Sequence, residues 1–166
     1  MQFGVWDIAM VAPRWWIIVT GIVMGVGLIA LAELSSRLFP VAMEQIEQAM
    51  LQLWSKIELQ WTPLTIVLLS VTAGVGEELL FRAAVQGVLV AHLPVGLALL
   101  LAAILFGLAH WISMGYMLVV AILGLVFGLV FHFTGSLLLV MVAHTIYDLS
   151  ALRQLGDKLA VMRHAE

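Results

Sequence analysis

Cysteine is absent from this 166-residue sequence, and charged residues are scarce. Without cysteine, the protein has no disulfide bond, no thiol nucleophile and no cysteine-ligated metal. Charged residues make up 10% of the chain, against about 25% in a typical soluble domain. Because hydrophobic residues make up 64%, the chain cannot cover itself with a water-compatible surface. The composition therefore predicts an integral membrane protein.

Basic patches and a recognisable signal peptide are also absent. The net charge is −3 and the pI is about 5.9, which argues against a nucleic-acid partner. Asp7 and Arg14 precede an apolar run that is longer than the hydrophobic region of a signal peptide. We therefore expect a first membrane helix from about residue 15, and no cleaved signal.

Long apolar runs supply the membrane helices. A helix needs about 20 mainly apolar residues to cross a bilayer, and short polar or Pro/Gly-containing breaks separate such runs here. In one segment, apolar residues recur at helical spacing while Glu and Gln take the other face, which predicts an amphipathic helix at the interface or packed on the bundle. We expect this amphipathic helix at 41–61, transmembrane helices at 15–32, 63–91, 94–112, 116–133 and 136–152, and a polar tail at 153–166.

The distribution of Lys and Arg predicts an orientation. Five crossings place the termini on opposite sides of the membrane, and the side with more Lys and Arg is normally cytoplasmic. One side holds only Arg14. The other side, which includes the C-terminus and is expected to be cytoplasmic, holds Arg37, Lys56, Arg153, Lys158 and Arg163.

Ionisable residues inside the apolar region are the candidates for function, because a charge in the hydrocarbon is costly. Residues 83–147 contain no Asp, Glu, Lys or Arg. Just before them, Glu78 and Arg82 stand one helical turn apart, within reach of an ion pair. Glu77 lies about 100° around the helix from Glu78. The arginine can thus neutralise one carboxylate and leave the other for chemistry.

Histidines supply the other candidates. His110 follows Phe106 at a spacing of four, and by itself it fits an interfacial residue equally well. His144 and Asp148 are also one turn apart, and a carboxylate in this position commonly orients an imidazole. The remaining histidines are expected to be solvated or interfacial, and they are His92, His132 and His164.

Taken in order, these residues resemble the motifs of a known family. The patterns are Glu77-Glu78-x-x-x-Arg82, Phe106-x-x-x-His110 and His144-x-x-x-Asp148. They are similar to those of the CPBP family, the CAAX proteases and bacteriocin-processing enzymes also called Abi. The resemblance covers about residues 63–152, and it implies an all-α membrane bundle with a catalytic core there. Residues 1–62 would then form an N-terminal transmembrane and connecting region.

The resemblance also implies an activity, namely hydrolysis of a peptide bond in a membrane-associated protein or peptide. Glu77, helped by His110, would activate a water, and His144 with Asp148 would stabilise the oxyanion or position the carbonyl. The CAAX protease branch has asparagine in place of Asp148, so this residue either stays protonated or orients His144. No cofactor is required in this interpretation.

Other interpretations remain open on the sequence alone. Glu77, His110 and His144 could instead hold a zinc ion with an open position for water. The chain could also be a non-catalytic immunity or scaffold protein of the same fold, or a small transporter with a proton relay, although an evident repeat is lacking. We expect the protein in the cell membrane, and the substrate and the oligomeric state are not indicated.

Overall fold

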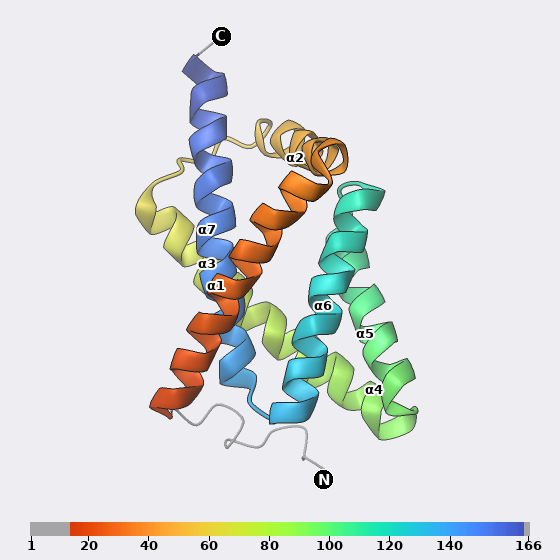
Figure 1. Cartoon of the computed structure of the whole chain (residues 1–166). Coiled ribbons are helices and arrows are strands. Elements are labelled where there is room, and N and C mark those ends of the chain that lie inside the picture. Colours follow the sequence, from red (N-terminus) through yellow and green to blue (C-terminus); the bar gives the residue numbers. More distant parts are fainter. Residues whose placement is uncertain (1–13, 165–166) are drawn as a thin grey trace.

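The computed structural model describes residues 14–164, so the expectation about the segment that contains Asp7 falls outside the described residues. Within the described range every element is a helix (Figure 1). This confirms the predicted all-α membrane bundle. In chain order the elements are α1 (Trp15–Leu38), α2 (Pro40–Trp54), α3 (Pro63–Glu78), η2 (Leu79–Gln86), α4 (Gly87–His92), α5 (Val95–Ala109), α6 (Met114–Thr134) and α7 (Leu137–His164).

The apolar runs form helices of membrane-spanning length. Among the described residues, three helices are long and apolar enough to cross a bilayer: α1, the continuous helix of residues 63–92, and α6. Helix α5 is apolar but shorter, with 15 residues, and α7 runs the length of the bundle (Figure 1). Many large apolar side chains of these helices point outward, which suits lipid contact. The protein is an integral membrane protein.

Helix α7 is the centre on which α1 and α3 pack. Gly21 and Gly25, one turn apart on α1, lie so close to α7 that a Cβ at either would approach a backbone oxygen of α7 to 2.8 Å. A Cβ at Gly74 of α3 would approach Thr145 of α7 even more closely. Small residues at four-residue spacing allow such close approach of helices in lipid. These contacts hold α3, with its two glutamates, directly against the histidine of α7.

The amphipathic helix α2 lies across one end of the bundle (Figure 1). It starts at Pro40, one residue before the predicted start, and it ends at Trp54 and not at residue 61. The following residues are non-helical because tertiary contacts hold them: Arg163 donates to the backbone oxygens of Ile57 at 3.1 Å and Leu59 at 3.4 Å. Trp61 packs edge-on against Trp54, with ring centres 5.5 Å apart.

Helix α7 does not end at residue 152, and the expected polar tail is helical to His164. Leu155 and Leu159 of this extension are buried against Leu51 of α2. Lys158 forms an ion pair of 2.5 Å with Glu47, also on α2. One face of these last three turns packs on α2, and this contact keeps the extension helical and part of the bundle.

The helix of residues 63–92 is not uniform, and its middle is a π-helix, η2. Directly after Glu78 the winding widens for eight residues, which the sequence pattern did not predict. The π-helical turn buries Arg82 and Gln86, and the Gln86 side chain donates to the backbone oxygen of Gly128 on α6 at 3.0 Å. Single π-helical turns are rare and occur frequently at functional sites. Here the π-helix turns the polar face of the helix into the bundle.

Candidate active site

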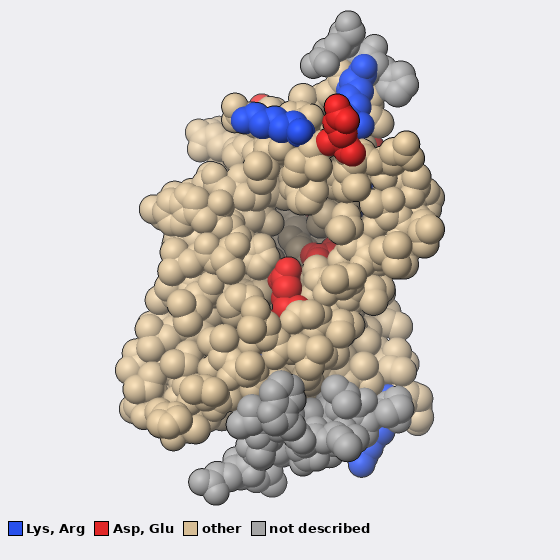
Figure 2. All heavy atoms as spheres, turned by 180° about the vertical axis from the view of Figure 1, so that it is seen from behind, with Lys and Arg blue, Asp and Glu red and all other residues tan. Residues whose placement is uncertain are grey.

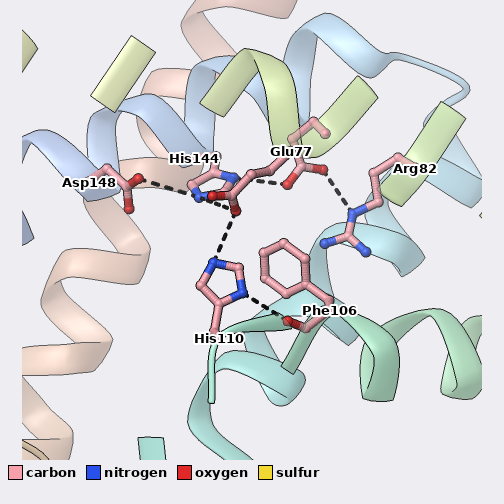
Figure 3. Close-up of polar contacts among 7 residues, drawn as sticks. Glu77, Arg82, Phe106, His110, His144 and Asp148 are labelled. Atoms are coloured by element: carbon pink, nitrogen blue, oxygen red, sulfur yellow. Dashed lines mark hydrogen bonds and ion pairs between the residues drawn. The ribbon is translucent and has the colours of Figure 1, made fainter. Parts of the chain in front are cut away.

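The six polar residues singled out in the sequence lie together (Figure 3). They come from four parts of the chain that only the fold brings side by side. Glu77 and Glu78 end α3, Arg82 is on η2, His110 follows α5, and His144 and Asp148 are on α7.

Glu78 is the buried centre of a three-residue chain. One of its oxygens, Oε2, accepts from Nε of Arg82 at 2.8 Å, as the sequence spacing predicts. The other, Oε1, lies 2.9 Å from Nδ1 of His144, a contact that sequence reasoning missed. Glu78 and Arg82 are both 0% exposed. Because a carboxylate paired with arginine can only accept, Nδ1 of His144 carries a hydrogen and donates it to Glu78.

Two phenylalanines enclose the guanidinium of Arg82. Its central carbon lies 4.8 Å from the ring centre of Phe106 and 6.0 Å from that of Phe127. A cation over an aromatic face is stabilised by the ring quadrupole. Phe127 also stacks on His144, with ring centres 5.1 Å apart and planes at 19°. Nothing in the sequence singles out Phe127, because a phenylalanine in an apolar helix looks like any other core or lipid-facing residue.

His110 faces the glutamates and is not a simple interfacial residue. It caps the end of α5, and its Nδ1 lies 2.8 Å from the backbone oxygen of Phe106. A carbonyl oxygen only accepts, so Nδ1 carries the hydrogen of the neutral ring. In the neutral ring the other nitrogen, Nε2, carries no hydrogen, and it lies 3.3 Å from Oε2 of Glu77.

Glu77 stands between the two histidines. The same oxygen, Oε2, is 4.0 Å from Nε2 of His144, and the side chain is 29% exposed, in contrast to the fully buried Glu78. Asp148 approaches His144 from the same side, with Oδ2 3.5 Å from Nε2. The imidazole of His144 is therefore held at Nδ1 by Glu78, and Asp148 lies at the nitrogen that faces Glu77.

A cavity of about 550 Å³ gives access to this cluster. Figure 2 shows it as a hollow in the middle of one face, with acidic side chains at its edge and inside, whereas the basic side chains lie towards the ends of the molecule. The walls come from α1, α2, α6 and α7 as well as from the site itself. Two tyrosines, Tyr116 and Tyr147, line the cavity. Sequence reasoning missed both, because a single tyrosine in an apolar helix has no distinctive spacing.

Glu77, His110 and His144 are the three residues that the sequence offers as zinc ligands. A tetrahedral site needs three ligands directed at one point about 2.0–2.2 Å from each donor atom. Among the described residues, no group of three or more His, Cys, Asp or Glu side chains is arranged to hold a metal ion. The side chains in this arrangement do not fit a tetrahedral zinc site.

The other histidines lie apart from the cluster. His92 contacts the backbone oxygen of Val88 at 2.9 Å, and His132 packs edge-on against Phe133. Neither lines the cavity. The side chain of His164 falls outside the described part of the chain.

Comparison with known families agrees with the geometry. The model of the family described as type II CAAX prenyl endopeptidase Rce1-like matches residues 59–150, which contain all six clustered residues. Neither a curated protein nor a solved structure matches the chain significantly. The match spans more than half of the sequence and confirms the resemblance to the CAAX protease family. The chain thus belongs to the Rce1-like family of type II CAAX prenyl endopeptidases.

Proposed function

We propose that this protein is an intramembrane endopeptidase that hydrolyses a peptide bond in a membrane-associated protein or peptide with water activated by Glu77 and His110. The observation that carries the proposal is the position of Glu77. Its carboxylate is half-buried at the wall of the cavity, 3.3 Å from one imidazole nitrogen and 4.0 Å from another. Neither nitrogen carries a hydrogen in the neutral tautomers, so the three atoms form a basic pocket for one water molecule.

The chemical step follows general base catalysis. The water donates a proton to the base formed by Glu77 and His110, and its oxygen bonds to the carbonyl carbon of the substrate. The π electron pair of the carbonyl moves to its oxygen and creates an oxyanion. When the oxyanion collapses, the C–N bond breaks, and the proton returns from the base to the leaving nitrogen. The products are a carboxylic acid and an amine, the acid then loses its proton to solvent or to the amine, and no covalent enzyme intermediate forms.

The remaining residues keep this base in place. Glu78 holds the ring of His144 through Nδ1, and Arg82 neutralises Glu78 in a site without water contact. His110 is fixed by the backbone of Phe106. Fixed polar groups cost little reorganisation at the moment of reaction, which is the main source of electrostatic catalysis.

The test is cleavage of a library of membrane peptides by the purified protein in detergent, with His110→Ala beside the wild type. We expect cleavage by the wild type that survives a zinc chelator, and a loss of about 10²-fold in kcat for His110→Ala because the second base is removed. Loss of cleavage on chelation, with recovery on added zinc, would establish the zinc enzyme instead. If the wild type cleaves no peptide, a non-catalytic scaffold becomes the better interpretation, and proton-driven flux in liposomes would support a transporter.

We also propose that the end of the molecule that carries α2 and the C-terminus faces the cytoplasm. Among the described residues, Arg14 precedes α1 at the opposite end, and the basic residues of α7 lie beyond its middle (Figure 1). The sequence has no cysteine, so single cysteines can report the orientation without background. Val161→Cys, at a position that is 71% exposed, should react with a membrane-impermeant maleimide only after the cells are opened. Trp15→Cys should react in intact cells, and the reverse pattern would contradict the proposed orientation.

A further inference from the structure

Among residues 14–164, a hydrogen bond holds only one of the two ring nitrogens of His144. Nδ1 lies 2.9 Å from Oε1 of Glu78. The other nitrogen, Nε2, is 3.5 Å from the carboxylate of Asp148 and 4.0 Å from that of Glu77, beyond the usual N–H···O range of about 2.7–3.2 Å. A single hydrogen bond fixes one atom and lets the ring turn about that contact. The plane of the imidazole is thus set by its other neighbours.

Two phenylalanine rings enclose this imidazole. Phe127 stacks on its face, with ring centres 5.1 Å apart and planes at 19°. Phe106 meets it edge-on, with ring centres 6.2 Å apart and planes at 74°. Phe127 is 1% exposed, and a close-packed interior leaves such a ring little room to move aside. The stacked face therefore restricts the tilt of His144 and with it the direction of Nε2.

Phe127 is itself held by its neighbours along α6. Three residues earlier, Gly124 lies so close to the ring of Phe106 that a Cβ there would approach Cδ1 to 2.8 Å. Directly after Phe127, the backbone oxygen of Gly128 accepts from Nε2 of Gln86 at 3.0 Å. A Cβ at Gly128 would lie 2.8 Å from Oε1 of the same amide. The segment Gly124-x-x-Phe127-Gly128 thus lets α5 and η2 approach α6 on both sides of the stacked ring.

The side chain of Gln86 has an energetic cost in this position. It is 2% exposed, and its Oε1 has no hydrogen-bond partner among the described residues. A buried polar atom without a partner lowers stability, and a leucine would fill a similar space without that cost. Proteins keep such unfavourable groups mainly at functional sites.

We propose that Phe127 is a positioning residue for His144, and that Gln86 holds Phe127 in place through the backbone of α6. This rests on the proposed function. Neither residue donates or accepts a proton in the reaction. Phe127 fixes the plane of the imidazole, and the plane fixes where Nε2 stands relative to Glu77 and the substrate carbonyl. A displacement of about 1 Å at such a group can cost about 10²-fold in rate.

Phe127→Leu tests the stacked ring, and Phe131→Leu is its matched control. Phe131 is one turn later on α6 and packs against the same core cluster, but it has no ring contact with a histidine among the described residues. We expect kcat to fall by about 10- to 100-fold for Phe127→Leu with KM within about threefold, because the change misplaces a reacting group and leaves substrate binding intact. The control should keep kcat within about threefold.

Gln86→Leu tests the support of Phe127. The change removes the unpartnered buried oxygen, so the melting temperature should not fall. It also removes the hydrogen bond to Gly128, so kcat should fall by about three- to tenfold. A residue with a purely structural role would give the opposite result, a lower melting temperature with unchanged kcat in the folded protein.

The order of the His144 ring can be measured without any substrate. In protein with ¹³C-labelled histidine, the His144 signal is assigned by its absence in His144→Gln. The order parameter of its ring C–H bonds should be about 0.85 in the wild type and in Phe131→Leu, and below about 0.6 in Phe127→Leu, the values of rigid and flexible groups.

The possible results separate the two proposals. If Phe127→Leu keeps full kcat, or if its His144 ring is as ordered as in the wild type, the positioning role is overturned and the proposed function stands. If the wild type cleaves no peptide, the proposed function falls, and the order parameter alone decides whether Phe127 positions the ring. Should Phe127→Leu fail to fold, Gln86→Leu decides, because full activity, or a loss of activity together with a lower melting temperature, overturns the proposal.

Discussion

Replacing Arg82 with methionine should lower the free energy of unfolding by about 3–5 kcal/mol, the usual cost of breaking a buried ion pair. Arg82 and Glu78 are both fully buried and 2.8 Å apart, so the variant leaves a carboxylate inside the bundle without its cation. The protonatable His144 is its only other polar contact among the described residues. Thermal or chemical unfolding of the purified protein in detergent measures the loss.

A double variant separates the effect of the Glu78–Arg82 charge pair from the effect of the packing of the Arg82 side chain. In Arg82→Met with Glu78→Gln, the charge is removed from both partners, and the glutamine oxygen can still accept from Nδ1 of His144. This variant should recover most of the lost stability, since replacing both members of a buried pair is often neutral. Arg153→Met, at an exposed position on α7, should have almost no effect. Equal losses in the single and double Arg82 variants would show that the packing of Arg82 on Phe106, and not its charge, stabilises the fold.

Replacing Glu77 with glutamine should lower kcat by about 10²- to 10⁴-fold, the range for removal of a general base. The amide keeps the shape of the side chain but cannot take a proton from water. Because Glu77 is partly exposed at the cavity wall and His110 is its nearest polar neighbour at 3.3 Å, the melting temperature should stay within a few degrees of the wild type. Steady-state kinetics on a cleaved membrane peptide, together with thermal unfolding, measures both.

Glu44→Gln is the matched control for this variant. Glu44 is on the outer face of α2 and does not line the cavity, so the same loss of one carboxylate should leave kcat within about twofold. If Glu77→Gln retains its activity while the protein cleaves peptides, Glu77 is not the base, and the catalytic assignment has to move to another carboxylate of the cavity. If Glu77→Gln loses activity and also unfolds, the result concerns the fold and not the chemistry.

The arrangement explains why two adjacent glutamates serve one site. Glu78 points inward, where Arg82 and His144 occupy both of its oxygens. Glu77, one residue earlier, points to the cavity and contacts histidines with only one oxygen. Neighbouring residues on a helix face different directions, so a single turn supplies both a buried anchor and an accessible base.

The sequence by itself determined the class of protein, most of the helix positions and the six clustered residues. Membrane helices depend on runs of apolar residues and on breaks such as Pro40, Pro63 and Pro94, and both are local properties. Ionisable side chains are conspicuous in a region that otherwise has none, because their burial in hydrocarbon is costly. The Glu78–Arg82 pair was also predictable, since residues one turn apart on a helix are neighbours.

Only the tertiary structure decided how these residues are connected. Glu78 meets His144 because glycines such as Gly74 let α3 approach α7 closely, and this contact joins positions far apart in the chain. The same holds for the stacking of Phe127 on His144, for the two tyrosines in the cavity wall, and for the last turns of α7, which pack on α2. Apolar and aromatic residues carry no local signal of their partner, so their roles follow from packing between distant segments and cannot be read from spacing along one helix.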